Sequence, residues 1–256
     1  MDKFKNSDQK MNLNNDNYNN QQNEIFKNES QYEKEVINEI IIELKISDKE
    51  IEKEINILCD KNKLNEDIKK NEDFYRKKNI NPPKEFNYFN KNNTKLYLND
   101  KEIEFNYKIT FSKIGFNKII IKLNIKLFNL STMFYNCKNI INIKFIKFKT
   151  KNVIDMSYMF YHCENLSELN LSSFNTNNVI DMSYMFYDCY KLSELNLSSF
   201  NTNNVIDMSH MFFNCEKLSK LNLSSFNTNN VINISYMFLG CTNLSELNLS
   251  SLILIK

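Results

Sequence analysis

Five cysteines recur at a constant interval, and they are the residues of this chain most able to do chemistry. They lie at Cys137, Cys163, Cys189, Cys215 and Cys241, each 26 residues after the one before. A thiolate can act as a nucleophile, form a disulfide or bind zinc. Structural zinc needs ligands grouped in closely spaced pairs, and these cysteines form no such pair. We predict buried, reduced thiols, with disulfides and a metal site as the alternatives.

Two histidines, His162 and His210, each stand near one of these cysteines. A nucleophilic thiol needs a nearby base and a third group that orients the base. Neighbouring residues of a repeat point to different faces, and no third group is evident, so we expect no enzyme activity. Two histidines are also too few for a multi-histidine metal site. No cofactor is expected, because a chain with two glycines cannot hold a glycine-rich phosphate loop.

The cysteine interval belongs to an internal repeat, the feature to be sought first in any sequence. The copy Asn152–Asn177 reads NVIDMSYMFYHCENLSELNLSSFNTN, and the next, Asn178–Asn203, differs from it at three positions. Further copies begin at Asn204 and Asn230, and a degenerate first copy spans Leu127–Lys151. One copy cannot bury its apolar edges alone, whereas stacked copies can.

Two spacings inside the repeat predict its local structure. Leu166, Leu169 and Leu171 show the L-x-x-L-x-L spacing of a leucine-rich repeat, and the alternation of the last two predicts a short strand. Apolar residues from Val153 to Cys163 lie three to four apart, which predicts short helical turns. We therefore predict an α/β leucine-rich-repeat solenoid over residues 124–256, with five coils, short parallel strands and short helical turns.

The whole motif, N-V-x-D-M-S-x-M-F-x-x-C-x-x-L-x-x-L-N-L-S-x-F-N-T, resembles the BspA-like leucine-rich-repeat family, which includes uncharacterised mycoplasma and protist surface proteins. The resemblance covers about residues 127–252. It implies a leucine-rich-repeat solenoid without catalytic activity, a role in adhesion or protein binding, and a place at the cell surface. The last copy departs from the motif, because Asn233 and Ile234 replace Asp and Met.

These observations predict a non-catalytic protein-interaction module. The alternatives are an adhesin-like surface protein of an expanded repeat family and a truncated repeat gene product. No export signal is visible, so the cytoplasm is the default location. We expect no nucleic-acid partner, since Arg76 is the one arginine, and no membrane span, since no apolar run approaches the required ~20 residues. The apolar end, Leu252–Ile255, makes self-association through an open C-terminal edge plausible.

The polar face of the predicted strands is the candidate interaction surface, because the concave faces of solenoids commonly bind partners. Its residues are Glu168, Asn170, Ser172, Glu194, Asn196, Ser198, Lys220, Asn222, Ser224, Glu246, Asn248 and Ser250. The alternative for this face is a purely structural ladder of asparagines that share amide hydrogen bonds between coils. On the opposite, convex side, Tyr158, Tyr184, His210 and Tyr236 are predicted to form an aromatic stripe.

The first half of the chain has a different character. Residues 1–30 are rich in Asn, Gln and Lys and predict a disordered tail. Residues 31–123 are expected to form a small β-rich module with a linker near 79–93, where two prolines stand. This module would cover the first coil, because an open solenoid end exposes its core.

Within this module the β-branched pattern of Val36–Leu44 predicts a strand, with Ile51–Leu58 as its hairpin partner. A helix over Asp48–Leu58 is the rival interpretation. The segment Lys61–Arg76 is expected to be helical or irregular. The alternating segment Lys95–Phe105 predicts a second hairpin.

Overall fold

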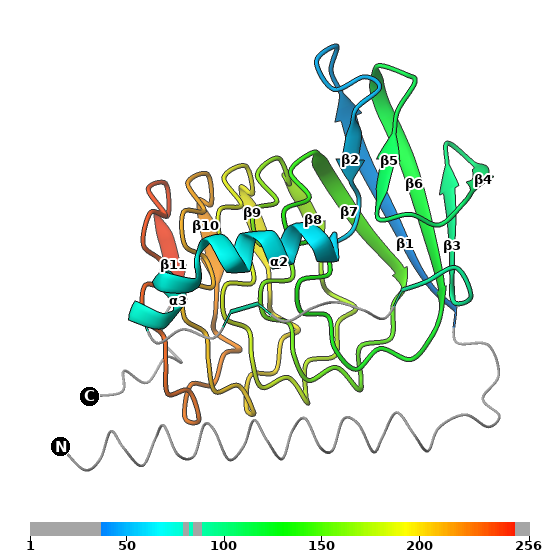
Figure 1. Ribbon diagram of the computed structural model, residues 1–256. Coiled ribbons are helices and arrows are strands. Elements are labelled where there is room, and N and C mark those ends of the chain that lie inside the picture. Colours follow the sequence, from blue (N-terminus) through cyan, green and yellow to red (C-terminus); the bar gives the residue numbers. More distant parts are fainter. Residues whose placement is uncertain (1–36, 79–81, 84–88, 249–256) are drawn as a thin grey trace. The chain divides into compact units, whose positions relative to one another are not determined.

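The computed structural model describes residues 37–78, 82–83 and 89–248 (Figure 1). All of them belong to one compact unit, Val36–Lys256. The predicted tail at residues 1–30 and most of the predicted linker near 79–93 lie outside the described residues.

A six-stranded mixed sheet is the largest sheet, with the order β4-β3-β6-β1-β7-β8. Its strands are β1 (Ile37–Ile46), β3 (Thr94–Leu98), β4 (Lys101–Ile103), β6 (Gly115–Asn124), β7 (Ile140–Lys147) and β8 (Glu168–Asn170). Alternate residues of β1, such as Ile40 and Ile42, are fully buried, as expected for a strand with one face on the core. Strand β1 pairs antiparallel with β6 along its whole length and with β7 on its other edge. Both edges of β1 are therefore occupied.

Of the two hairpins predicted from the sequence, one is wrong and the other is confirmed. Strand β2 (Glu54–Asn56) pairs with β5 (Lys108–Thr110), because no edge of β1 is left for it. The hairpin predicted over Lys95–Phe105 is present as β3 and β4. Its turn residues Asn99 and Asp100 both have positive φ, which suits a two-residue turn between twisted strands.

Two helices follow β2, in the segment predicted to be helical or irregular. They are α2 (Lys61–Lys70) and α3 (Glu72–Lys78). Asp60 caps α2, because its Oδ1 accepts a hydrogen bond from the N–H of Asn62 at 3.0 Å. The other oxygen of Asp60 lies 2.7 Å from Nζ of Lys108, so the start of α2 is tied to β5.

The predicted α/β leucine-rich-repeat solenoid is wrong. The described chain is mainly β, with the six-stranded sheet, the β2–β5 pair and a three-stranded parallel sheet of order β11-β10-β9. The last consists of β9 (Glu194–Asn196), β10 (Lys220–Asn222) and β11 (Glu246–Asn248). Both described helices precede the repeats, and the repeats show no helix within the described residues.

The apolar residues that lie three to four apart in the repeats belong to successive turns, not to helices. Tyr158 and His162 have positive φ, which a right-handed helix does not allow. The N–H of Tyr158 donates to the carbonyl of Ser183 at 2.9 Å, and that of Phe160 donates to Met185 at 2.9 Å. In a helix each N–H would instead bond to a carbonyl four residues earlier. Turns and helices share a spacing of three to four residues, so the sequence pattern did not separate them.

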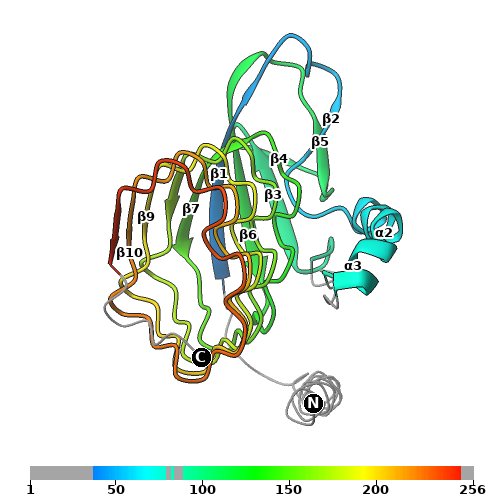
Figure 2. The ribbon, with the colours of Figure 1, turned by 90° about the vertical axis from the view of Figure 1, so that its left-hand side faces the viewer.

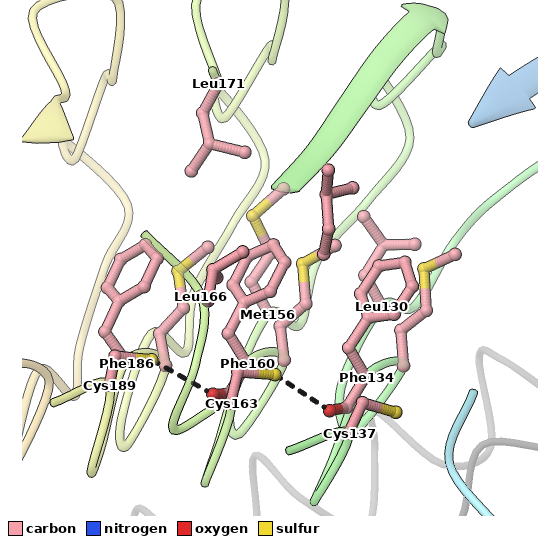
Figure 3. Packing of buried hydrophobic residues seen from close by; sticks show 14 of the residues in the cluster. Leu130, Phe134, Cys137, Met156, Phe160, Cys163, Leu166, Leu171, Phe186 and Cys189 are labelled. Carbon is pink, nitrogen blue, oxygen red and sulfur yellow. Dashed lines mark hydrogen bonds between the residues drawn. The ribbon is translucent and has the colours of Figure 1, made fainter. Parts of the chain in front are cut away.

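Because the repeats follow the same path (Figure 2), equivalent side chains stack in columns. The rings of Phe134, Phe160 and Phe186 stack with centroids 5.6 and 5.5 Å apart and are nearly parallel (Figure 3). Beside them, Sγ of Cys163 donates to the carbonyl of Phe134 at 3.2 Å. The repeat cysteines are free thiols, buried as predicted except for Cys241, which is partly exposed.

Candidate interaction surface

The polar strand face is exposed as predicted. The side chains that the structure describes on it, all exposed, are Glu168, Asn170, Ser172, Glu194, Asn196, Ser198, Lys220, Asn222 and Ser224. The parallel register of β9 and β10 places Lys220 beside Glu194 and Asn222 beside Asn196. Ser250 lies outside the described residues, as do the side chains of Glu246 and Asn248.

The asparagines of this face act within their own repeats. Oδ1 of Asn170 accepts a hydrogen bond from the N–H of Ser172 at 2.9 Å, which turns the chain at the end of β8. A shared amide contact between repeats occurs elsewhere, where Nδ2 of Asn201 donates to Oδ1 of Asn177 at 3.0 Å. The strand face therefore displays polar and charged side chains, without an apolar anchor among them.

The opposite side carries two stacked columns of rings. The first is the predicted stripe of Tyr158, Tyr184, His210 and Tyr236, with successive centroids 4.6, 4.5 and 5.0 Å apart. The second consists of Tyr135, Tyr161, Tyr187 and Phe213, with centroids 4.9, 4.8 and 4.5 Å apart. Sequence reasoning missed the second column, because its positions vary between copies, although each of its members is aromatic. We call the two columns together the aromatic face.

Helix α2 covers the first part of the aromatic face. Its Leu64 and Ile68 pack in one cluster with the rings, and Tyr158 and Tyr184 are only 4% and 5% exposed. In Figure 2 the helices lie on one side of the repeats and strands β9 and β10 on the other. The stripe predicted on the outer surface is therefore largely an internal interface.

Beyond this helix cover the aromatic face is open. A groove of about 380 Å³ lies there, lined mainly by rings. The lining includes Tyr75 of α3, Tyr184, Tyr187, His210, Phe213 and Leu239. Tyr236 and Leu239 at its far end are 57% and 53% exposed. We call this the aromatic groove.

Two polar atoms of the aromatic groove are buried without a hydrogen-bond partner among the described residues. They are Oη of Tyr184 and Nδ1 of His210. Burial lowers the pKa of His210, so this imidazole is uncharged near neutral pH. Both atoms lie beneath the accessible surface, so the wall that the groove presents is mainly apolar.

A row of carboxyls runs through the repeats. Asp155, Asp181 and Asp207 face one another in neighbouring repeats through parallel bridges, and Asn129 and Asn233 occupy the equivalent places at the two ends. Burial, followed by the neighbouring carboxyls, raises the pKa of Asp181 to about 8. This carboxyl is therefore mostly protonated at neutral pH. We call the row the aspartate ladder.

The cysteine and histidine positions are not arranged as a nucleophile and its base. Sγ of Cys163 faces the carbonyl of Phe134, whereas Nδ1 of His162 lies 3.1 Å from a carboxylate oxygen of Asp188. Within residues 37–78, 82–83 and 89–248, no group of three or more His, Cys, Asp or Glu side chains is placed to hold a metal ion. In the same residues no helix is both long and apolar enough to cross a membrane.

The repeats match one known family. Residues 128–251 match the family described as "Mycoplasma protein of unknown function, DUF285". The repeat region is DUF285-like. The expected resemblance to BspA-like leucine-rich repeats is therefore wrong: the DUF285-like repeats share the leucine spacing, but turns stand where helical segments were expected. The match covers just under half of the chain.

No curated protein and no solved structure matches this chain. The aromatic groove and the aspartate ladder both lie within the DUF285-like region, apart from Tyr75, which α3 contributes. The segment Leu252–Ile255, expected to support self-association, lies outside the described residues.

Proposed function

We propose that this chain is a non-catalytic protein-interaction module whose aromatic groove receives an apolar helical segment of a partner protein. The observation that supports this proposal is that the chain's own helix α2 already packs on the same aromatic face. The aromatic groove continues that face past Tyr75 of α3. A second helix can therefore pack on the open part of this face in the same way as α2 packs on the covered part.

The spacing of the α2 residues that contact the rings favours a helical partner segment. Leu64 and Ile68 are four residues apart, and such residues lie on the same side of a helix. Inside the aromatic columns the ring faces are taken up by stacking on neighbouring rings, so the groove presents mainly ring edges. A flat ligand that stacks on ring faces has little to bind, whereas aliphatic side chains pack well against edges.

The unpartnered polar atoms place no demand on the partner. Oη of Tyr184 and Nδ1 of His210 are already buried in the chain itself, so an apolar cover adds no cost of desolvation there. The exposed strand face is the weaker candidate, since interface energy concentrates in buried aromatic and arginine anchors.

The experiment uses a peptide with the sequence of residues 60–78, which contains α2 and α3, carrying a fluorophore. We expect saturable binding to the full chain by fluorescence anisotropy, at least about tenfold weaker for the chain variant Leu239→Lys. Ile114→Lys is the matched control, because Ile114 is equally exposed, at 52% against 53%, and is not among the groove residues. A peptide carrying Leu64→Lys should not bind. Equal binding by wild type and Leu239→Lys would rule out the aromatic groove as the site.

A further inference from the structure

The aromatic groove and helix α2 use some of the same rings. Leu64 and Ile68 of α2 pack in one cluster with rings of the aromatic face, and several of those rings also line the groove. The rings that belong to both are Tyr158, Tyr161, Tyr184 and Tyr187. A partner helix that fills the groove therefore reaches rings of the cluster in which α2 already packs.

Few apolar contacts hold α2 on these rings. Leu64 is the one buried residue of α2, Ile68 is half-buried, and the remaining side chains are charged or amides. Lys63 pairs with Asp67 of the same helix at 3.2 Å, a contact that persists when the helix leaves the rings. Helix α3 adds the buried ring of Tyr75, which lines the groove. The apolar row that α2 and α3 place on the aromatic face is therefore short.

The start of α2 is attached more firmly than the helix itself. The N–H of Cys59 donates to the carbonyl of Met133 at 2.9 Å, and Asp60 pairs with Lys108 of β5 at 2.7 Å. Both contacts precede the first residue of α2. The helix can therefore leave the rings while its start stays attached to the rest of the chain.

The rings under α2 would extend the groove if the helix were removed. Tyr135, Tyr158 and Tyr184 are only 5%, 4% and 5% exposed in the covered chain. They stand in the same two columns as the rings that are open beyond α2. A partner helix with a longer apolar row than α2 would bury more apolar surface on this face than α2 does, which favours the exchange.

We propose that α2 is an autoinhibitory cover, which a partner helix displaces from the shared rings and whose docking lowers the affinity of the chain for that partner. This inference rests on the proposed function, because the competing segment is the one that the aromatic groove receives. When only a fraction of the molecules is uncovered, the observed affinity is reduced by that fraction. The strength of α2 docking therefore selects partner segments with long apolar rows over those with short ones.

The test measures binding of the labelled peptide of residues 60–78 to chains with a weakened cover. The chain variant Leu64→Lys should bind the unchanged peptide at least about tenfold more tightly than wild type, because its rings are uncovered. Leu64→Ala should shift the affinity in the same direction by less. Glu66→Lys is the matched control, because it places the same side chain at an exposed position of the same helix, and it should bind as wild type does. Slow amide exchange at Phe160 and Phe186 shows that the repeats of each variant are folded.

Cys59 reports displacement of α2 in the wild-type chain. Its side chain is 1% exposed and belongs to the same cluster as Leu64. Saturating peptide, which contains no cysteine, should raise the rate at which a thiol reagent labels Cys59 at least about tenfold, measured by mass spectrometry. Cys189, which is buried within the repeats, is the internal reference and should be labelled no faster.

The autoinhibitory cover and the groove fail in different experiments. Equal affinities of wild type and chain Leu64→Lys, or a labelling rate of Cys59 that saturating peptide leaves unchanged, would overturn the autoinhibitory cover. Weaker binding by Leu239→Lys would then still support the aromatic groove. Tighter binding by chain Leu64→Lys with faster labelling of Cys59, but no effect of Leu239→Lys, would support the cover and rule out the groove. Absence of binding to both wild type and chain Leu64→Lys would overturn both proposals.

Discussion

Replacing Asp181 by asparagine should stabilise this protein and flatten the dependence of its stability on pH. In the aspartate ladder, Oδ1 of Asp181 accepts a hydrogen bond from the N–H of Ser183 at 2.9 Å, which an asparagine oxygen can also accept. The chain contains its own precedent at Asn233. There Oδ1 accepts from the N–H of Ser235 at 3.1 Å, and Nδ2 donates to Asp207 at 3.2 Å.

The direction and size of the change in stability with pH follow from the raised pKa of Asp181. Burial and the neighbouring carboxyls raise the pKa of Asp181 from its ordinary 3.8 to about 8 in the folded chain. Between these two pH values the folded state keeps a proton that the unfolded state has lost, so stability falls as pH rises and levels off above pH 8. At about 1.4 kcal/mol per pKa unit the loss is at most about 6 kcal/mol, and sharing of protons along the ladder reduces it to roughly 2–5 kcal/mol.

The assay is urea unfolding of wild type and Asp181→Asn at about pH 5 and about pH 8. Wild type should lose stability between the two, and the variant should lose much less and be the more stable protein at the higher pH. Asp48→Asn makes the same chemical change at an exposed carboxyl and should follow wild type. Parallel pH profiles for wild type and Asp181→Asn would refute the raised pKa of Asp181 in the folded chain.

Three further predictions concern the repeats. Phe186→Ala, in the middle of a stacked column, should lower the free energy of unfolding in urea by about 3–5 kcal/mol. Phe116→Ala, at a ring that is 71% exposed, should lower it by under about 1 kcal/mol. Equal losses would contradict the column packing. Gly240→Ala should loosen the last repeat and speed amide exchange there, because φ is +82° and the added Cβ would collide with Asn214 of the preceding repeat. Gly115→Ala, where φ is +96° but the space is open, should lower the free energy of unfolding less. A thiol reagent followed by mass spectrometry should label Cys241 first among the repeat cysteines under native conditions, and labelling of the others at the same rate would mean that they are not buried.

The features of the candidate sites that depend on local sequence could be predicted, and those that depend on distant segments could not. The exposure of Glu168 and its equivalents could be predicted, because alternation along a strand sends successive side chains to opposite faces. The cover of α2 on Tyr158 could not, since it depends on where a separate segment docks. The aromatic groove is what that cover leaves open, so its position depends on the length of α2 and α3 and on the number of repeats together.

The amino-acid sequence by itself determined the period of 26 residues, the matching of like residues between repeats and the burial of the cysteine positions. A strict repeat gives each residue the same neighbours one period away, so columns follow from the sequence alone. Only the tertiary structure decided that the segment around Tyr158 forms turns, because its N–H bonds to Ser183, 25 residues on, and local spacing carries no information about that partner. It also decided the raised pKa of Asp181, since that shift depends on burial and on the carboxyls that neighbouring repeats place beside it.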